Sequence, residues 1–461
     1  MMLRKPIGMI VWGLGALMLS QTRADEPRAS RPNVVLCMAD DLGWGDTGYN
    51  GHPVLRTPHL DRMAAEGLRF ERFYASSPVC SPTRGSCLTG RHPYRYGIPY
   101  ANTGHMLPDE VTLAEVLREQ GYATGHFGKW HLGTLTTKMK DANRGQVGNV
   151  RDYSPPWQNG FDACFSTESK VPTWNPMQDP QTGRPYGTHY WTGAEQLVSE
   201  NLEGDDSRII MDRVLPFVRS AAQANQPFLA VIWFHAPHLP VVSRPPYTDG
   251  YDEHRDYYGC ITALDEQMGR LRAELERAGV ANNTMLWFCS DNGPEGKSEK
   301  QGGRTNGLRG RKRSLYEGGV RVPGLLIWPE QVKSARMIAM PCSTCDYFPT
   351  VLAALGYEMP DELARPYDGV NLLPMIDGRM TERPRPIGFE SRGQLALTDN
   401  RFKIYSGNNG KQFELYDLGE DPGEKNDLAQ QHPDTLRAMR KQLEAWRASC
   451  HKSAAGDDYR D

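Results

Sequence analysis

The chain has 461 residues, of which 39% are hydrophobic and 24% charged, and its formal net charge is −3. This length is enough to bury a large core, and it predicts one large domain with a smaller one in an ordinary globular protein. Because the chain has no excess of basic residues, nucleic acid is excluded as a partner.

Residues 1–24 have the features of a secretory signal peptide. Arg4 and Lys5 precede an apolar run at 7–19, and small residues around Ala24 suit a cleavage site. The run is shorter than the roughly 20 residues of a membrane-spanning helix, so we expect no membrane anchor. The sequence therefore predicts a mature chain that starts near Asp25 and is exported, either to the periplasm or out of the cell.

Two acidic residues follow the first predicted strand. The apolar run 33–38 is typical of a buried strand in a parallel sheet, and it leads into Asp40 and Asp41. Ligands of open α/β sheets bind at the carboxyl ends of strands, and paired carboxylates there attract Ca²⁺ or Mg²⁺. Taken alone, the pair is more typical of a helix cap and a solvated turn than of a metal site. A helix is predicted next, over 57–73.

The following segment predicts a helix that carries a reactive sulfur. Ser81 can cap the free N–H groups, Pro82 suits the first helical position, and Gly90 ends the helix. Cys80 then lies at the positive end of the helix dipole, where an anion is stabilised. Arg84 follows one turn later on the same face, and its guanidinium suits bidentate binding of a tetrahedral oxyanion.

A second pair of polar residues follows another strand. We expect a helix over 108–121 and a strand over 122–127, which ends shortly before Lys129 and His131. In an extended segment these two side chains point the same way. Each alone is typical of a solvated or satisfied polar residue, but their place after a strand end, flanked by glycines, favours a site.

Periodicity is lost over 139–206, which we interpret as a long insertion over one rim of the sheet. Its aromatic residues either stack on a sugar or, as is commoner, hold the loop in place; they are Trp157, Trp174, Tyr186, Tyr190 and Trp191.

Regular structure resumes after the insertion. A helix over 207–219 precedes a buried strand over 228–234, which runs into His235 and His238. A long helix over 257–279 follows, and then a buried strand over 284–290 that ends in Asp291 and Asn292. Because both oxygen-bearing pairs follow parallel strands, Asp40, Asp41, Asp291 and Asn292 can form one hard-oxygen cage.

The rest of the chain closes the large domain and adds a small one. The basic run 309–313, which includes Lys312, returns next to the acidic strand end, and a helix over 346–355 closes the domain. From 366 onward, short segments at 395–398, 402–405 and 413–418 predict a small antiparallel sheet, and 433–450 a terminal helix. Nine cysteines in this length are no disulfide scaffold, and Cys342 and Cys345 are either a local disulfide or two thiols.

We therefore predict an α/β protein with two parts. Residues 25–365 form a large, mostly parallel mixed sheet sandwiched by helices, and residues 366–461 form the small antiparallel sheet with its helix.

The run from Cys80 through Pro82, Arg84 and Gly85 to residues 88–91 (Leu-Thr-Gly-Arg) resembles the signature of the type I sulfatases. The resemblance extends over about 33–428 and includes the closing segment 414–418. It implies an alkaline-phosphatase-like fold and a catalytic sulfatase domain. It also implies that a maturation enzyme oxidises Cys80 to Cα-formylglycine, and that the hydrate of this aldehyde is the nucleophile. Arg84 matches the residue that holds the hydrate and helps to fix the metal site.

The resemblance further implies one Ca²⁺ per chain. Asp40, Asp41, Asp291 and Asn292 match the calcium ligands of the family, and Cys80 is an additional metal contact. Relatives with two transition metals usually carry His at the position of Asn292, whereas an amide oxygen favours calcium.

The remaining matched positions bind the sulfate group and move protons. Lys129 and Lys312 match the lysines that grip the sulfate oxygens, and His131 matches the histidine that hydrogen-bonds the formylglycine hydroxyl. His238, in a His-x-Pro pattern, matches the histidine near the leaving oxygen, and His235 is its rival for that place.

The implied reaction is hydrolysis of a sulfate ester to sulfate and an alcohol. One hydroxyl of the hydrate attacks sulfur, His238 or Lys312 protonates the alcohol, and His131 deprotonates the second hydroxyl so that the aldehyde re-forms. We expect a sulfated carbohydrate as substrate. The alternatives are a phosphate or phosphonate ester hydrolase of the same superfamily, or a silent relative that only binds sulfated glycans.

Overall fold

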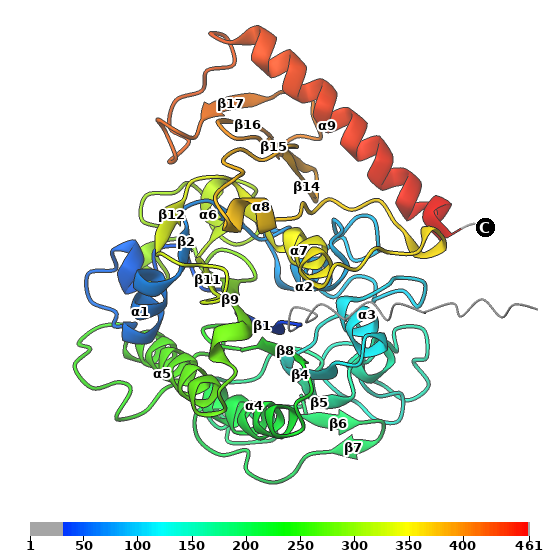
Figure 1. The fold of residues 1–461 in the computed structure, drawn as a ribbon. Coiled ribbons are helices and arrows are strands. Elements are labelled where there is room, and N and C mark those ends of the chain that lie inside the picture. The colour runs from blue at the N-terminus through cyan, green and yellow to red at the C-terminus, as the bar shows by residue number, and fades with distance from the viewer. Residues whose placement is uncertain (1–30, 460–461) are drawn as a thin grey trace, which may run out of the picture.

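The computed structural model describes residues 31–459, so the predicted signal peptide lies outside the described residues. At its centre is a ten-stranded mixed sheet with the strand order β12-β2-β11-β9-β1-β8-β4-β5-β6-β7 (Figure 1). Strands β9, β1, β8, β4 and β5 are parallel to one another and form the middle of the sheet, whereas β11 on one side and β6 on the other run antiparallel to their neighbours. The predicted α/β class with a mostly parallel mixed sheet is confirmed.

The strands of the large sheet are β1 (Asn33–Ala39), β2 (Leu68–Phe70), β4 (Ala123–Lys129), β5 (Ala163–Thr167), β6 (Trp191–Gly193), β7 (Gln196–Leu197), β8 (Phe228–Trp233), β9 (Thr284–Ser290), β11 (Gly324–Ile327) and β12 (Arg336–Ile338). A three-stranded sheet contains β3 (Phe73–Tyr74), β10 (Arg321–Val322) and β13 (Cys342–Ser343), and a four-stranded sheet contains β14 (Ile387–Ser391), β15 (Gln394–Thr398), β16 (Phe402–Ser406) and β17 (Glu414–Asp417). The α-helices are α1 (Pro58–Glu66), α2 (Cys80–Thr89), α3 (Leu113–Glu119), α4 (Asp206–Gln223), α5 (Arg255–Arg277), α6 (Glu317–Val320), α7 (Tyr347–Leu355), α8 (Leu373–Ile376) and α9 (Pro433–Ala454).

Helices cover both faces of the central sheet because its strands are apolar on both sides. In β1, Val34, Leu36 and Met38 pack in one core with residues of α2, α3 and α7. The alternate residues Val35 and Cys37 pack in a second core with residues of α1, α4 and α5. Successive side chains of a strand point to opposite faces, so a continuous apolar run indicates burial on both. Figure 1 shows the two helical layers on either side of the sheet.

Three predicted elements differ from the structure. The predicted helix over 57–73 ends at Glu66 as α1, and the chain then forms β2 and β3. The helix predicted from residue 108 begins at Leu113, because Thr112 and Glu115 form a capping box there. The insertion 139–206 is not irregular throughout: it contains β5, which pairs in parallel with β4. The five residues of β5 mix polar and apolar types, so they carry no apolar run.

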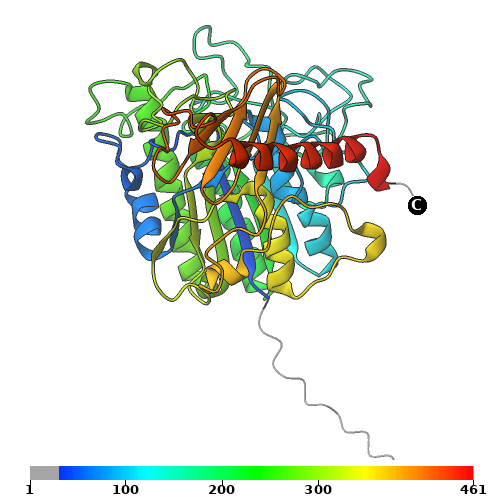
Figure 2. The same ribbon diagram turned by 90° about the horizontal axis from the view of Figure 1, so that it is seen from above.

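The C-terminal part is the predicted small antiparallel sheet with its helix. Strands β14 to β17 follow one another in order, and α9 packs across them (Figure 1). Strand β14, which the sequence analysis does not predict, adds an edge strand to the expected three. In Figure 2, α9 lies across this sheet on the outside of the molecule, while the long loops gather beyond one end of the central strands.

A buried ionic cluster joins the small sheet to the large part of the molecule. Lys403 on β16 lies 2.8 Å from Glu317 on α6 and 3.0 Å from Glu424, and all three side chains are fully buried. The hydroxyl of Tyr74 on β3 donates a 2.9 Å hydrogen bond to Glu317. One cation thus holds two carboxylates that come from different parts of the chain.

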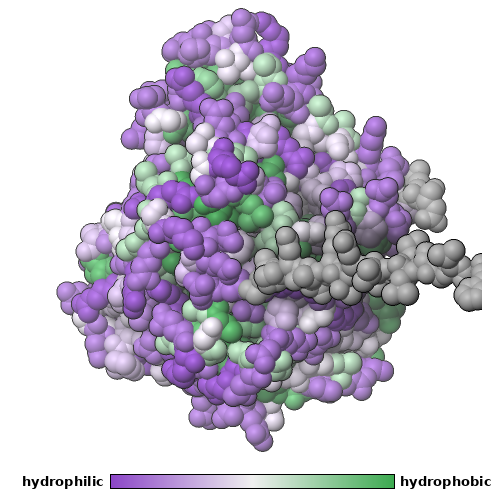
Figure 3. Space-filling model, in the orientation of Figure 1, coloured by the Kyte–Doolittle hydropathy of each residue, from purple (hydrophilic) through white to green (hydrophobic). Residues whose placement is uncertain are grey.

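The surface shows no large apolar area on the face seen in Figure 3, where hydrophobic residues are scattered among hydrophilic ones. Within residues 31–459, no helix has the length and apolar character that crossing a bilayer requires. All nine cysteines are buried free thiols, so Cys342 and Cys345 are two thiols and not a disulfide.

We expect Lys403→Met to lower the free energy of unfolding by about 3–5 kcal/mol, because the substitution removes the cation that two buried carboxylates share and leaves Glu317 only the more distant Arg321, at 3.8 Å. Urea unfolding followed by tryptophan fluorescence measures this change. Lys411→Met is the matched control: Lys411 is exposed in the same small sheet region, and we expect a change within about 0.5 kcal/mol. Equal effects of the two substitutions would contradict a stabilising role for the cluster.

Candidate active site

Two neighbouring parallel strands bring the predicted acidic residues together. Strands β1 and β9 pair with Ala39 opposite Ser290, so Asp40 and Asp41 emerge beside Asp291 and Asn292. The backbone N–H of Asp41 donates a 3.0 Å hydrogen bond to a carboxylate oxygen of Asp291. Carboxylate oxygens of Asp40, Asp41 and Asp291 lie within 4.8 Å of one another, and all three residues are buried. The structure thus assembles the predicted oxygen cage.

Helix α2 presents Cys80 to this cage. Cys80 is the first helical residue, only 4% exposed, and Gly90 ends the helix in a left-handed conformation, as expected. The predicted cap by Ser81 is wrong: the extended residue Val79 precedes the helix, and the Ser81 hydroxyl makes no hydrogen bond. Ser81 already lies inside the first turn, where its side chain cannot reach the free N–H groups at the helix start.

Arg84 lies one turn after Cys80 and faces the carboxylates. Its guanidinium is 2.7 Å from Asp291 and 3.5 Å from Asp40, and it donates a 3.2 Å hydrogen bond to the carbonyl of Lys129. The guanidinium carbon also lies 5.3 Å from the ring centroid of Trp233, the last residue of β8. These contacts fix Arg84 completely within the protein, in a position that links three strand ends.

Two lysines approach the cage from different elements. Lys129, the last residue of β4, lies 2.6 Å from Asp40, and Lys312 lies 2.6 Å from Asp41. Both ammonium groups are almost entirely buried. Burial alone would lower the pKa of Lys312, but Asp41, Cys80 and Asp40 outweigh it and raise the pKa. Lys312 therefore stays a cation.

His131 adjoins Cys80 and is held by an amide. Its Nε2 donates a 2.7 Å hydrogen bond to the side-chain oxygen of Asn102, so Nδ1 is left as the acceptor. Burial and the charge of Lys129 lower the pKa of His131 to about 3, which keeps the imidazole neutral. A neutral imidazole next to residue 80 is able to accept a proton.

The two histidines after β8 have different surroundings. His235 is fully buried, and its two nitrogens contact Asp206 at 2.7 Å and Thr167 at 2.8 Å. His238 donates from Nδ1 to the carbonyl of Leu239, so its Nε2 faces Asp41 at 3.7 Å. Its side chain is 12% exposed and lies with Asp40 and Cys80. His238, and not His235, therefore borders the cage.

The cage fits a hard divalent cation. One oxygen of Asp40 and the amide oxygen of Asn292 are buried and have no hydrogen-bond partner. The amide nitrogen of Asn292 already donates to Asp41 at 2.7 Å and to the carbonyl of Gly293 at 2.9 Å, so its oxygen is free to bind a metal. Unpaired buried oxygens next to further carboxylates are the ligand set that Ca²⁺ prefers.

Charge repulsion inside the cage supports the same conclusion. Burial and the neighbouring Asp40 carboxylate raise the pKa of Asp291. Burial would also raise the pKa of Asp40, but Lys129, His238 and Arg84 lower it overall. Burial likewise opposes ionisation of Cys80, yet Lys129, Lys312 and His131 together lower its pKa well below the ordinary value. Residue 80 therefore lies in a strongly electropositive pocket beside a group of crowded carboxylates.

Four residues at the site escape the sequence analysis: Asn102, Lys170, Trp233 and Glu295. Asn102 holds His131, Trp233 packs on Arg84, and Glu295 lies 3.7 Å from Lys312. Lys170 follows β5, the strand within the insertion that the sequence does not predict. The only sequence signal is that Trp233 lies in a predicted buried strand, 228–234.

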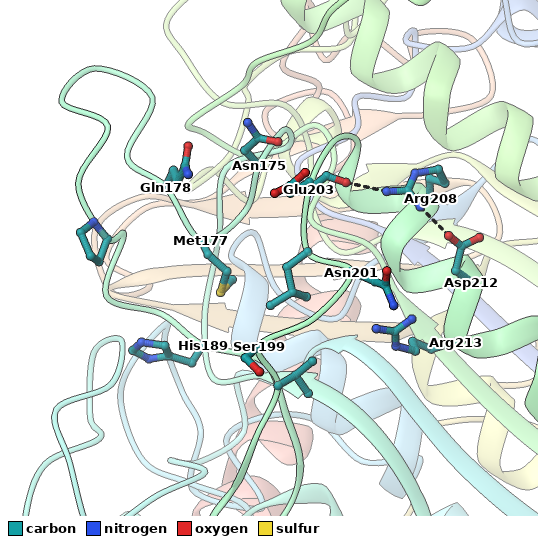
Figure 4. A pocket seen from close by; sticks show the side chains of 13 residues that line it. Asn175, Met177, Gln178, His189, Ser199, Asn201, Glu203, Arg208, Asp212 and Arg213 are labelled. Carbon is teal, nitrogen blue, oxygen red and sulfur yellow. Dashed lines mark hydrogen bonds and ion pairs between the residues drawn. The ribbon is translucent and has the colours of Figure 1, made fainter.

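The insertion and α4 also border an open cavity of about 1020 Å³ that is separate from these residues (Figure 4). Asn175, Gln178 and His189 line one side, and Arg208 and Arg213 of α4 line the other. Arg208 is already bonded to the Glu203 carbonyl and to Asp212 (dashed lines in Figure 4). None of the predicted site residues lines this cavity.

Two of the insertion's aromatic residues hold the loop in place. Tyr190 is buried and stacks on Phe165 with ring centroids 4.0 Å apart, and Trp191 is buried and donates a 3.0 Å hydrogen bond to Asp141. Neither ring is therefore free to stack on a sugar, which supports the commoner of the two interpretations for these positions.

The fold and the site define a hydrolase of the alkaline-phosphatase-like class. The sulfatase family model matches residues 32–357, and the model of the C-terminal region of N-sulphoglucosamine sulphohydrolase matches residues 310–449. The chain belongs to the sulfatase family and is a sulfuric ester hydrolase.

Individual relatives agree with this assignment. The chain is 32% identical to N-acetylgalactosamine-6-sulfatase of Sus scrofa, over 93% of this chain and 87% of that protein. It is 30% identical to steryl-sulfatase of Homo sapiens, over 77% and 71% of the two chains. Among solved structures it is similar to Ps i-CgsB in complex with k-i-k-neocarrahexaose, with a TM-score of 0.79 and 25% identity over 93% and 97% of the two chains.

The two histidines after β8 are separable by mutation. We expect His235→Leu to lower the free energy of unfolding by about 2–4 kcal/mol, because Asp206 and Thr167 lose their buried partner. We expect His238→Leu to leave stability within about 1 kcal/mol and to reduce kcat by about 100-fold or more. Thermal unfolding and turnover of a sulfate ester, measured on both variants, check this. A stable, active His238→Leu protein would exclude His238 from the reaction.

Proposed function

We propose that the enzyme hydrolyses sulfate esters of carbohydrates with a formylglycine derived from Cys80 and one Ca²⁺ bound beside it. The observation that carries the proposal is the position of Cys80: it begins α2, faces a cage of three carboxylates and is surrounded by Lys129, Lys312 and His131. A plain buried thiol has no use for this arrangement, whereas a nucleophile that attacks an anionic group needs it.

Asp40, Asp41, Asp291 and Asn292 would hold the calcium ion, with residue 80 as a further contact. The free oxygens of Asp40 and Asn292 point to such a role. When bound, Ca²⁺ supplies positive charge to the transferring sulfate group, and formylglycine supplies a hydrated aldehyde as nucleophile. Arg84, tied to both Asp40 and Asp291, would keep the carboxylates in place.

The side chains around residue 80 divide the remaining work. Lys129 and Lys312 bind the oxygens of the sulfate group and neutralise the charge that grows on them. His131, neutral and held by Asn102, removes a proton from a hydroxyl group at residue 80. His238, or else Lys312, donates a proton to the alcohol oxygen that leaves. The nucleophile then lies at the start of α2, and the base and the proton donor follow the ends of β4 and β8, so that all three surround the sulfur of the transferring sulfate group.

The substrate class rests on the relatives. One is named for N-acetylgalactosamine 6-sulfate, and a similar structure contains a neocarrahexaose, which is an oligosaccharide. Steryl-sulfatase is similar at almost the same identity, but its name gives a different alcohol. A carbohydrate agrees with the polar rim of the site, where Asn102, Asn143 and Ser169 are linked by hydrogen bonds.

The proposal also requires export and a maturation enzyme. The predicted signal peptide at 1–24 would take the chain to the periplasm or out of the cell, and a formylglycine-generating enzyme would have to act on Cys80. The rigid, buried position of Cys80 in α2 favours oxidation before the chain folds.

The mass of the tryptic peptide 73–84, from protein made in its native host, tests the modification. We expect an aldehyde or its hydrate at position 80, together with hydrolysis of a sulfate ester at least 100-fold faster than of the matching phosphate ester. Cys80→Ala should lose turnover entirely. An intact thiol in a fully active enzyme would overturn the proposed nucleophile, and faster phosphate hydrolysis would favour the alternative phosphate esterase.

Calcium removal tests the cage. We expect dialysis against EGTA to lower the melting temperature and abolish activity, because the buried carboxylates then repel one another, and Ca²⁺ should restore both. Asn292→Ala should weaken Ca²⁺ binding, measured by calorimetry, about tenfold or more. The same protein with Mg²⁺ in place of Ca²⁺ is the control. Unchanged stability and calcium affinity in Asn292→Ala would remove Asn292 from the ligand set.

A further inference from the structure

The segment that follows β5 crosses the mouth of the site. At its start, the carbonyl of Glu168 accepts a 3.0 Å hydrogen bond from the backbone N–H of His131. At its end, the N–H of Thr173 donates to the carbonyl of Pro240, in the turn that carries His238. Lys170 lies in the middle of this segment and therefore between the two histidines of the site.

The backbone around Lys170 is held firmly. The Glu168 carboxylate accepts hydrogen bonds from the backbone N–H groups of Arg144 and Gly145, at 2.9 and 3.0 Å. The hydroxyl of Ser169 accepts one from Asn143 at 2.8 Å. A side chain on a fixed backbone is suited to a recognition role because little order is lost when it binds a ligand.

The ammonium group of Lys170 is the exception among the cations of the site. Arg84, Lys129 and Lys312 each contact a carboxylate within 2.7 Å. No residue between 31 and 459 forms an ion pair or hydrogen bond with the side chain of Lys170, which is nevertheless only partly exposed. A half-buried charge without a partner is costly unless a ligand supplies the counter-charge.

The charges of the cage act on this ammonium group. Burial lowers the pKa of Lys170, the charges of Lys129 and Lys312 lower it further, and Asp40 and Asp41 oppose the shift. The side chain thus interacts with the same charges that surround residue 80. It lies three residues beyond the end of β5, whereas Lys129 is itself the last residue of β4.

We propose that Lys170 binds a second anionic group of the substrate, a carboxylate or a second sulfate, next to the sulfate ester that is hydrolysed. The inference rests on the proposed function of the site and narrows its substrate class to polyanionic glycans. Lys129 and Lys312 are already assigned to the transferring sulfate, so the additional cation calls for an additional anion. A charge-assisted hydrogen bond from the ammonium group would provide the recognition.

Binding measured without turnover tests the inference separately from the reaction. In the Cys80→Ala background, calorimetry measures the affinity for three sugars. They are N-acetylgalactosamine 6-sulfate, the disaccharide in which a uronate is linked to this sugar, and the same disaccharide with its carboxyl group reduced. The affinities for glucosamine 2-N,6-O-disulfate and N-acetylglucosamine 6-sulfate are compared in the same way. This second pair shows whether the additional anion is a sulfate rather than a carboxylate. We expect Lys170→Gln to weaken binding of at least one dianionic sugar about tenfold or more and to change its monoanionic counterpart less than twofold.

Two further variants separate recognition from folding. Lys138→Gln makes the same change at an exposed lysine just before the same insertion, which only approaches Glu195 at 3.7 Å, and should alter neither affinity nor turnover. Lys170→Arg keeps the charge and should recover most of the lost affinity. In the matured enzyme, Lys170→Gln should raise KM for the dianionic sugar and leave kcat within twofold.

Several outcomes would overturn the role of Lys170. If Lys170→Gln weakened binding of mono- and dianionic sugars equally, Lys170 would bind the transferring sulfate instead. An unchanged affinity for both sugars, or no binding of either sugar, would also contradict the proposal. Discrimination in the Cys80→Ala background without turnover by the matured enzyme would instead overturn the proposed reaction and leave the anion site in place.

Discussion

The arrangement of the site depends on a balance of charge at one edge of the central sheet. Three buried carboxylates, Asp40, Asp41 and Asp291, lie too close together to be stable alone, and three cations from separate elements hold them. In a region of low dielectric, each carboxylate and its cation depend strongly on the other. One carboxylate oxygen of Asp40 and the amide oxygen of Asn292 have no partner in the protein, so the protein's own cations leave the cage incompletely neutralised at these atoms. The divalent cation that we propose for this site would complete that balance.

The same balance explains why the reactive residue is in a helix and not on a loop. The N-terminus of α2 gives residue 80 a positive environment, and one turn later Arg84 ties the helix to the strand ends. His131 and His238, the residues that we propose to move protons, are held by other groups, and each retains one nitrogen toward the site. Rigid ion pairs thus position the centre, while the groups that must change protonation keep a free atom.

The insertion between β4 and α4 has two separable parts. One part, around β5, is a strand of the central sheet and carries Lys170 to the mouth of the site. The other part, around residues 175–203, borders a cavity whose arginines are already paired. The first part lies where a substrate would meet the catalytic groups, which makes it the part of the insertion suited to choosing among sulfated substrates.

The sequence by itself determined the apolar strands, the acidic residues after β1 and β9, the Cys-x-Pro-x-Arg helix and the polar residues after β4 and β8, because each is encoded by a local pattern of apolar runs, caps and glycines. It did not reveal β5, whose short mixed segment has no apolar run, nor the true start of α2 one residue before Ser81. The sequence favoured His238 over its rival His235, but only the tertiary structure showed that His238 borders the cage, and that Asn102 and Lys170 belong to the site. Those choices depend on which side chains meet across 30 to 250 residues of chain, and non-local contacts of this kind leave no periodicity in the sequence.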